Sequence, residues 1–404
     1  MFTRVWLLVC ALTLAPYSPK AQVSDGAVTI GVLTDLSGVY TDIAGRGSVV
    51  AAEMAVEDFG GTVLGKPIKL LAADHKNKPD IGSTIARKWI DEDKVDAFAD
   101  LVTSSVGLAI QSLATESKRI VLNSSAGTSK MTNDACSPYS VSWVYDTYSL
   151  ATVAARAILE EGGDTWFFIT ADYSFGHDLE ADVRRVLERK GAKILGSIKH
   201  PFPSTDMSSF LLRAQASGAK VIALANAGKD TINAITQARE FGIIGSGVKV
   251  VALLAFETDI RAIGLDKAQG TYVTTGFIWT GTPEARAWSD KFYAKTKRRP
   301  TSVQAGVYSS VMHYLKAVAA AGTDDPDRVM AQMRRMRVND FFTKDGYIRA
   351  DGRMVHDLYL GIVKTPKESR EEWDYIRLLK TVPGDLAFRP ATDSVCPLFA
   401  KKAP

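Results

Sequence analysis

The sequence has few cysteines, no excess of one charge and, beyond its first residues, no long apolar run. Three cysteines among 404 residues are too few for a disulfide-dense scaffold. The 49 Lys and Arg residues nearly balance the 45 Asp and Glu residues, and no long block of like charge occurs, so nothing indicates a nucleic-acid partner. No later apolar stretch approaches the roughly 20 residues of a transmembrane helix. The length suggests two domains, or three, and the composition is that of a soluble globular protein.

The first residues have the layout of a secretory signal peptide. Arg4 precedes the apolar run Val5–Ala15, and a stretch with Pro and Ser separates this run from Ala21. The run is too short to cross a bilayer as a helix. A buried first helix is the alternative, but the prolines end the apolar pattern. We therefore expect residues 1–21 to be removed on export.

Two cysteines remain after this cleavage, Cys136 and Cys396. In an oxidising compartment the simplest prediction is that they form one disulfide. Two buried free thiols are the alternative.

Short apolar runs rich in β-branched residues alternate with segments of helical periodicity. This alternation predicts βαβ units, parallel sheets and an α/β fold. The predicted strands are 28–34, 68–73, 97–102, 120–122, 166–170, 194–198, 221–225 and 250–254. The predicted helices are 45–59, 79–93, 106–117, 149–161, 176–190, 208–217, 231–241, 303–321 and 326–338.

The alternation is interrupted twice. It stops between Ser124 and Thr147 and then starts again, and a second irregular zone covers 270–283. Three later segments, 347–348, 358–363 and 373–379, have the pattern of hairpin strands. The interruptions predict two α/β lobes with more than one chain crossing between them.

Motifs for catalysis, cofactors and metals are incomplete or missing. The segment Gly60–Lys66 resembles a phosphate-binding loop, but Pro67 stands where a hydroxyl is required. Gly45–Val50 lacks the third small residue of a dinucleotide fingerprint. The five histidines are scattered, and no G-x-S-x-G segment occurs. We therefore expect no enzyme activity, no cofactor and no metal site.

The loops after the predicted strands contain hydroxyls, amides and aromatic rings. Ligands of open α/β sheets bind at the carboxyl ends of the strands. Hydroxyls and backbone N–H groups at helix N-termini can hold an anion, and aromatic rings can enclose an apolar ligand body. Helix capping alone is the alternative role for each polar residue. The residues at these positions are Tyr40, Ser104, Ser125, Thr128, Asp172, Tyr173, Phe175, Asn226 and Phe256.

Several segments together resemble the type I periplasmic solute-binding proteins of ABC transporters, in the group that is like branched-chain amino-acid-binding proteins. The segments are Val28–Tyr40, Ala51–Gly61, Leu64–Ile68, Ala171–His177 and Gln304–Tyr308. The resemblance covers the whole mature chain. It implies two doubly wound Rossmann-like lobes, each with a parallel central sheet, joined by a hinge of three crossovers. The implied division is 27–145 plus 280–346 for the N-terminal lobe, 146–279 plus 347–382 for the C-terminal lobe, and 383–404 for a tail.

The resemblance also implies a ligand cleft between the lobes. Ser104, Ser125 and Thr128 match positions that bind the ligand carboxylate in the family, and Tyr40 lies in a loop that forms a wall of the cleft. Amino-acid binders of this family hold the ammonium group with acidic residues. Here Phe256 or Glu257 matches one such position, and Asp146 is a further candidate. The remaining residues expected along the cleft are Tyr145, Asp172, Tyr173, Phe175, Asn226 and Trp279.

Three segments, Cys136–Tyr139, Tyr145–Tyr148 and Cys396–Leu398, resemble a subgroup that binds aromatic carboxylates such as benzoate derivatives. The resemblance therefore implies a monomeric periplasmic protein that captures an aromatic acid and delivers it to the membrane permease subunits of an ABC importer. A branched-chain or other amino acid is the alternative ligand. A ligand sensor for a membrane receptor and an exported enzyme are the alternative functions.

Overall fold

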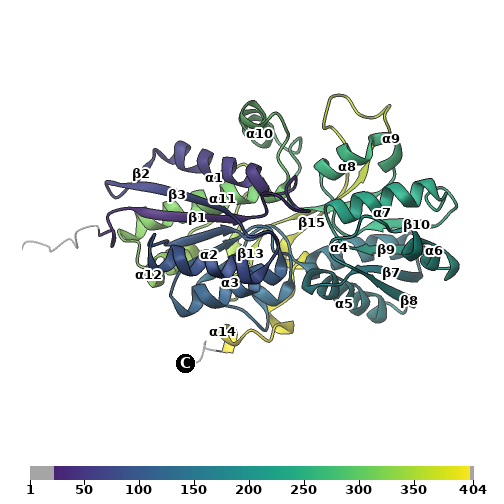
Figure 1. Cartoon of the computed structure of the whole chain (residues 1–404), viewed down its shortest axis with the longest axis horizontal. Coiled ribbons are helices and arrows are strands. Elements are labelled where there is room, and N and C mark those ends of the chain that lie inside the picture. The colour runs from purple at the N-terminus through teal and green to yellow at the C-terminus, as the bar shows by residue number, and fades with distance from the viewer. Residues whose placement is uncertain (1–21, 401–404) are drawn as a thin grey trace, which may run out of the picture.

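The computed structural model describes residues 22–400, and the predicted signal peptide lies outside the described residues. The chain forms two lobes that lie side by side (Figure 1). The first lobe contains the strands nearest the N-terminus, and the second contains the strands from the middle of the chain. Both are layers of helices around a sheet, which confirms the predicted α/β fold.

The first lobe is built on a six-stranded sheet in the order β2-β3-β1-β4-β5-β6. The strands pair in parallel except for β2, which pairs antiparallel with β3. Strand β1 is buried along its whole length, because helices cover both faces of a parallel sheet. The strands are β1 (Val28–Thr34), β2 (Thr62–Val63), β3 (Lys66–Asp74), β4 (Ala97–Asp100), β5 (Ile120–Asn123) and β6 (Ser140–Ser142).

The helices of the first lobe come from both ends of the chain. Helix α1 packs against α11, and α2 packs against α3. The helices are α1 (Gly45–Phe59), α2 (Pro79–Asp91), α3 (Ser104–Glu116), α10 (Pro283–Thr296), α11 (Ser302–Ala321) and α12 (Pro326–Arg335), with the short 3₁₀ helix η1 (Ser129–Thr132) after β5.

The second lobe has a parallel four-stranded sheet in the order β10-β9-β7-β8. Its central strand β9 is entirely buried. The strands are β7 (Thr165–Ala171), β8 (Lys193–His200), β9 (Val221–Ala225) and β10 (Lys249–Ala252). The helices are α4 (Thr147–Glu160), α5 (Ser174–Arg189), α6 (Ser208–Ala216), α7 (Lys229–Glu240), α8 (Glu257–Ile263) and α9 (Leu265–Ala268).

An antiparallel sheet in the order β11-β14-β15 packs against α4, and a small hairpin joins β12 to β13. The hairpin contacts α12, and its Arg353 forms a bridge with Ser142 of β6, so it lies against the first lobe. The strands are β11 (Tyr272–Thr275), β12 (Tyr347–Ile348), β13 (Met354–Val355), β14 (Leu358–Val363) and β15 (Ile376–Val382). The C-terminal tail contains α13 (Gly384–Ala387), the 3₁₀ helix η2 (Ala391–Asp393) and α14 (Pro397–Ala400).

Both zones that the sequence indicated as irregular contain strands. The zone 124–147 contains β6, a three-residue strand in which two residues are serine. The zone 270–283 contains β11, whose partner β14 lies about 90 residues further along the chain. Local sequence patterns miss such strands because long-range pairing, not propensity, determines them. Helix α10 was also not predicted, although Thr282 caps it and Pro283 opens it.

The lobes are connected between β6 and α4, between β11 and α10, and between β13 and β14. The β12–β13 hairpin, which the predicted division places in the C-terminal lobe from residue 347, lies against the first lobe, and the other boundaries stay predictions. Cys136 and Cys396 form a disulfide with a Cα–Cα distance of 5.8 Å, as predicted.

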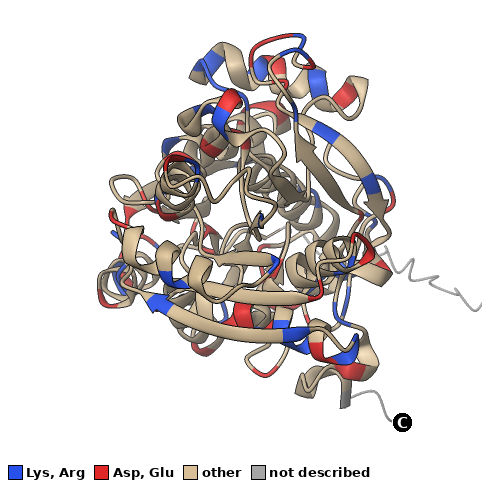
Figure 2. Cartoon of the chain, turned by 90° about the vertical axis from the view of Figure 1, so that its right-hand side faces the viewer, with Lys and Arg blue, Asp and Glu red and all other residues tan. Residues whose placement is uncertain are grey.

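The charges of the chain are mixed in sign (Figure 2). In this view the second lobe faces the viewer, and blue and red segments are interspersed without a large region of one sign, in agreement with the balanced composition. Within residues 22–400, no helix is both long and apolar enough to span a membrane.

Candidate ligand-binding site

A small pocket lies where the loops of the two lobes meet. The space between its side chains is about 10 Å³, which is room for one water molecule at most. The lobes are therefore closed on each other. The lining residues are Tyr40, Ile43, Val102, Ser104, Ser125 and Gly127 from the first lobe, Tyr145 from the first crossing, and Tyr173, Phe175, Ala227 and Leu254 from the second lobe.

The loop after β1 brings Tyr40 into the pocket. The carboxylate of buried Asp35 accepts hydrogen bonds from the backbone N–H of Gly38 at 2.7 Å and of Tyr40 at 2.9 Å. It also accepts a bond from the Asn77 amide at 2.6 Å. A Cβ at Gly38 would lie 2.5 Å from the Asn77 amide nitrogen, so a side chain there would displace the groups that hold this turn. The aspartate thus fixes a turn that orients Tyr40 toward the cleft.

Ser104 is the first residue of α3 and is almost fully buried. Its hydroxyl oxygen accepts the backbone N–H of Thr128 at 3.2 Å, and none of the described residues accepts the hydroxyl hydrogen. Thr103, the N-cap of α3, does not cap the helix with its side chain, because its hydroxyl donates to Asn77 instead. Ser104 therefore offers a free donor beside the uncapped positive end of a helix.

Ser125 and Thr128 have other partners. The Ser125 hydroxyl donates to the buried carboxylate of Asp100. Burial raises the pKa of Asp100. The Thr128 hydroxyl donates to Asp178 of α5 at 2.6 Å, so it connects the two lobes, and Thr128 does not line the pocket. The three hydroxyls predicted to hold a carboxylate are therefore unlike: the hydroxyl hydrogen of Ser104 is free, and those of Ser125 and Thr128 are not.

The second lobe contributes aromatic rings at the N-terminus of α5. The hydroxyl groups of Tyr40 and Tyr173 share a hydrogen bond that closes the cleft. Phe202 stacks on Tyr173 with ring centroids 4.1 Å apart, and it stacks on Tyr40 at 5.7 Å. Burial raises the pKa of the phenols of Tyr40, Tyr145 and Tyr173 above the ordinary value, so all three are neutral near pH 7.

Two other predicted residues lie behind the pocket wall. Phe256 is buried, with its ring centroid 6.3 Å from that of Tyr145. Asn226 is fully buried, where its amide contacts His200 and accepts the Thr231 hydroxyl at 2.7 Å. Asn226 thus holds the loop that carries the lining residue Ala227.

The sequence left open whether Phe256 or Glu257 faces the cleft, and neither lines it. Glu257 and its neighbour Asp259 are buried in α8, where burial raises the pKa of each carboxyl to about 7. The nearest lining residue of this segment is Leu254.

The last three predicted residues have contacts outside the pocket. Asp146 caps α4 by accepting the Ser149 N–H at 2.8 Å and lies 3.5 Å from Arg353. Asp172 is exposed and lies 2.7 Å from His177. The indole N–H of Trp279 donates to the carbonyl of Trp373 at 3.0 Å, and the guanidinium of Arg299 lies 4.1 Å above its ring.

Sequence reasoning missed the apolar part of the lining. Val102, Gly127 and Ala227 are close neighbours of predicted residues and lie on the same loops. A Cβ at Gly127 would lie 2.8 Å from the ring of Phe175 and 3.0 Å from the ring of Tyr145, so glycine lets the lobes approach. Ile43 and Leu254 are apolar, and the sequence gives no reason to distinguish them from core residues. The lining contains no Lys, Arg, Asp or Glu.

The two-lobed fold and the interlobe pocket define the class of the protein as a type I periplasmic binding protein. A sequence model of the family described as periplasmic binding protein matches residues 27–369. The chain therefore belongs to this family of solute-binding proteins of ABC transporters.

Solved structures resemble nearly the whole chain. A periplasmic binding protein from Burkholderia mallei is 46% identical, with a TM-score of 0.91, over 93% of this chain and 99% of its own. A branched chain amino acid ABC transporter periplasmic ligand-binding protein from Burkholderia xenovorans is 40% identical, with a TM-score of 0.83, over 92% and 99%. A solute-binding protein from R. palustris in complex with 4-hydroxybenzoate is 21% identical, with a TM-score of 0.80, over 89% and 97%, and at this identity it shows the fold alone. No curated protein matches the chain.

Proposed function

We propose that the protein captures a small aromatic carboxylate in the interlobe pocket and delivers it to the permease of an ABC importer. The lining of the pocket supports this proposal. It contains four aromatic rings and no charged side chain, and the rings are those of Tyr40, Tyr145, Tyr173 and Phe175. Aromatic walls suit a planar apolar body, and a few placed polar groups orient it. The protein binds and releases this ligand without a reaction, as a monomer in the periplasm.

The ligand carboxylate is held by neutral donors of the first lobe. Ser104 supplies its free hydroxyl hydrogen, and the first turn of α3 supplies backbone N–H groups at the positive end of the helix dipole. Hydrogen bonds to a charged group contribute roughly 1.5–3 kcal/mol each. Once the lobes have parted enough to admit the ligand, two or three such bonds replace the cation that the lining lacks.

A branched-chain or other amino acid is the second candidate ligand. The 40% identical relative from B. xenovorans carries a name of this kind, and Leu254, Val102 and Ile43 suit an aliphatic side chain. Against it, the ammonium group needs an acidic partner, and the carboxylates of Asp100, Glu257 and Asp259 lie outside the lining. A sensor that presents its closed form to a membrane receptor is a further alternative.

The test is a binding screen of the mature protein. Benzoate, 4-hydroxybenzoate, phenylacetate, leucine and benzyl alcohol are compared by thermal shift and then by calorimetry. An aromatic acid at 100 times its Kd should stabilise the protein by about 2.7 kcal/mol. Benzyl alcohol should stabilise it far less, because it lacks the anion. If leucine stabilises the protein and none of the aromatic acids does, the proposal is wrong and the amino-acid alternative takes its place.

Delivery to a permease needs a separate test. Cells that lack the gene should lose high-affinity uptake of the radiolabelled ligand and regain it with the gene restored. Unchanged uptake, together with loss of a transcriptional response to the ligand, would favour the sensor alternative.

A further inference from the structure

The C-terminal tail connects the lobes a fourth time. It leaves the second lobe at β15, and α13 packs against α4. It then passes the hinge, where the buried ring of Phe388 lies 5.5 Å from that of His356. The tail reaches the first lobe at Cys396, which is bonded to Cys136. In Figure 1 this yellow segment runs from the centre of the molecule to α14 below the first lobe.

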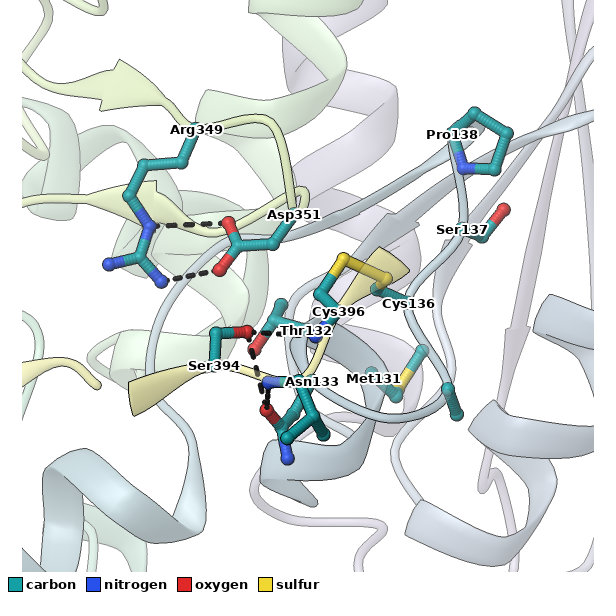
Figure 3. Close-up of a disulfide and its surroundings, with 12 residues drawn as sticks. Met131, Thr132, Asn133, Cys136, Ser137, Pro138, Arg349, Asp351, Ser394 and Cys396 are labelled. Carbon is teal, nitrogen blue, oxygen red and sulfur yellow. Dashed lines mark hydrogen bonds and ion pairs between the residues drawn. A yellow bond between two sulfur atoms is a disulfide. The ribbon is translucent and has the colours of Figure 1, made fainter. Parts of the chain in front are cut away.

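The far end of the tail is fixed to the first lobe beside the disulfide (Figure 3). The side-chain oxygen of Asn133 accepts the N–H of Val395 at 2.9 Å and the hydroxyl of Ser394 at 3.3 Å. These bonds and the disulfide form one anchor on the loop between η1 and β6. The tail after the hinge is therefore a covalent part of the first lobe.

Arg389 lies in the middle of this anchored segment. Its carbonyl accepts a bond from the Arg349 guanidinium at 2.7 Å, and Arg349 is itself paired with Asp351 of the β12–β13 hairpin. The Arg389 side chain points to the other lobe: its guanidinium lies 3.3 Å from Asp182 of α5 and 4.5 Å above the ring of Tyr148 of α4. The first lobe thus holds the Arg389 backbone. The guanidinium contacts mainly the second lobe and also lies 3.5 Å from the Ser129 hydroxyl of the first.

Asp182 belongs to a set of contacts between α5 and the loop after β5, which we name the latch. The latch consists of Thr128, Ser129, Asp178 and Asp182. The Ser129 hydroxyl donates to Asp182 at 2.9 Å, and the Thr128 hydroxyl donates to Asp178 one turn earlier at 2.6 Å. Because the hydroxyls are on the first lobe and the carboxylates on the second, opening the cleft breaks these bonds.

Opening is costly at Asp182 in particular. Its side chain is 4% exposed, and it also accepts the Thr147 hydroxyl at 2.7 Å and pairs with Arg185 at 2.5 Å, both on the second lobe. Separation of the lobes removes Ser129 and Arg389 together. Loss of a charged partner from a buried carboxylate is more expensive than loss of a surface ion pair.

We propose that the disulfide-anchored tail is a strap that presents Arg389 to Asp182 and thereby favours the closed form before any ligand binds. The disulfide acts by holding the tail in place. Without it, only the hydrogen bonds to Asn133 and Arg349 connect this segment to the first lobe, so Arg389 is held less firmly. Removal of Arg389 or of the disulfide should then lower the ratio of closed to open molecules by about tenfold.

The experiment compares the oxidised mature protein with variants and needs no ligand, so its outcome is independent of the ligand proposal. The variants are Cys136→Ser with Cys396→Ser, Arg389→Met and Arg389→Lys. Arg337→Met is the matched control, because Arg337 pairs with Asp345 and covers the ring of Tyr347 within the first lobe. The readouts are the radius of gyration from small-angle scattering and the amide exchange of 128–133 and 174–185.

If the strap favours the closed form, Arg389→Met and the double serine variant should have a larger radius of gyration than the wild type. Their amide hydrogens in 128–133 and 174–185 should also exchange faster. Arg389→Lys should recover most of the wild-type behaviour, and Arg337→Met should match the wild type. If the serine variant does not fold, reduction of the folded wild-type protein replaces it. An unchanged radius and unchanged exchange in Arg389→Met would overturn the proposal. Faster exchange throughout the chain, also in Arg389→Lys, would overturn it in favour of a purely structural tail.

Discussion

The two walls of the pocket differ in what they offer a ligand. The first-lobe wall contains Ser104, Ser125 and Gly127 on loops that follow β4 and β5, and it carries the free hydroxyl donor. The second-lobe wall consists of Tyr173, Phe175, Ala227 and Leu254 and is largely apolar. A ligand can therefore be oriented by the first lobe and covered by the second. Covering adds affinity only as the lobes close, so closure and binding are linked.

At Gly127 the facing rings leave no room for a side chain, so a substitution there should have the largest effect. Gly127→Val places methyl groups against the rings of Phe175 and Tyr145, which already lie 2.8 and 3.0 Å from an added Cβ. We expect the closed form to be lost and ligand affinity to fall at least about a hundredfold. Calorimetry measures the affinity, and scattering should show a larger radius of gyration.

Gly127→Ala is the graded control. Its single methyl group requires smaller shifts of the Phe175 and Tyr145 rings, so it should lose less affinity than Gly127→Val. Equal affinity of both variants and the wild type would mean that the walls do not close in this way.

The next comparison is between two serines of the first wall. Ser104→Ala removes a free donor, so it should weaken binding of an aromatic acid by roughly tenfold to a hundredfold. Ser125→Ala removes a hydroxyl that already donates to Asp100, so it should cost stability more than affinity. Titration calorimetry and thermal unfolding of both variants separate these effects.

The chemical form of the ligand sharpens this test. Wild-type protein should prefer benzoate strongly over benzyl alcohol, and Ser104→Ala should prefer it less. If Ser104→Ala keeps the wild-type ratio, the carboxylate is held elsewhere in the cleft.

A smaller loss of ligand affinity is expected at the contact between the hydroxyls of Tyr40 and Tyr173. Tyr173→Phe removes one member of the hydroxyl pair with Tyr40 and leaves the ring that stacks on Phe202. A neutral hydrogen bond contributes about 1 kcal/mol, so affinity should fall roughly fivefold. Tyr293→Phe, at a half-buried position of α10 outside the pocket lining, is the control and should bind as the wild type does. A loss of a hundredfold or more in Tyr173→Phe would show that the phenol contacts the ligand directly.

The smallest effect concerns a buried acid behind the second wall and changes stability only. Burial raises the pKa of Glu257 in the folded protein to about 7, whereas the unfolded chain titrates near its ordinary value of roughly 4.3. Between these values the folded state binds more protons, so the free energy of unfolding falls as pH rises. The stability of Glu257→Gln relative to the wild type should therefore rise by about 1–3 kcal/mol between pH 5 and pH 8.

Urea unfolding at both pH values measures this difference. Glu188→Gln, which removes an exposed acid from α5, is the control and should show little difference between the two conditions. A wild-type advantage at pH 8 would show that the ionised form of Glu257 is stabilised by a partner.

The sequence predicted the lobes well and the pocket in part. Strands such as β1 and β9 were found because parallel strands are uniformly apolar. Strand β11 was missed because its pairing with β14 is not local. Several predicted residues line the pocket because the loops that carry them follow strands, but the sequence pattern cannot tell which hydroxyl is free. That Ser104 is free, while Thr128 binds Asp178, depends on how the two lobes meet.

The smallness of the pocket has a kinetic consequence. With about 10 Å³ between its walls, an aromatic acid enters only after the hydroxyls of Tyr40 and Tyr173 have separated. The lobes therefore open before the ligand binds, and the rate constant of opening is the upper limit of the observed binding rate. In stopped-flow fluorescence, the observed rate should rise with ligand concentration and level off at a plateau. Tyr173→Phe should raise this plateau even as it weakens affinity, because the same contact that retains a ligand also delays its arrival.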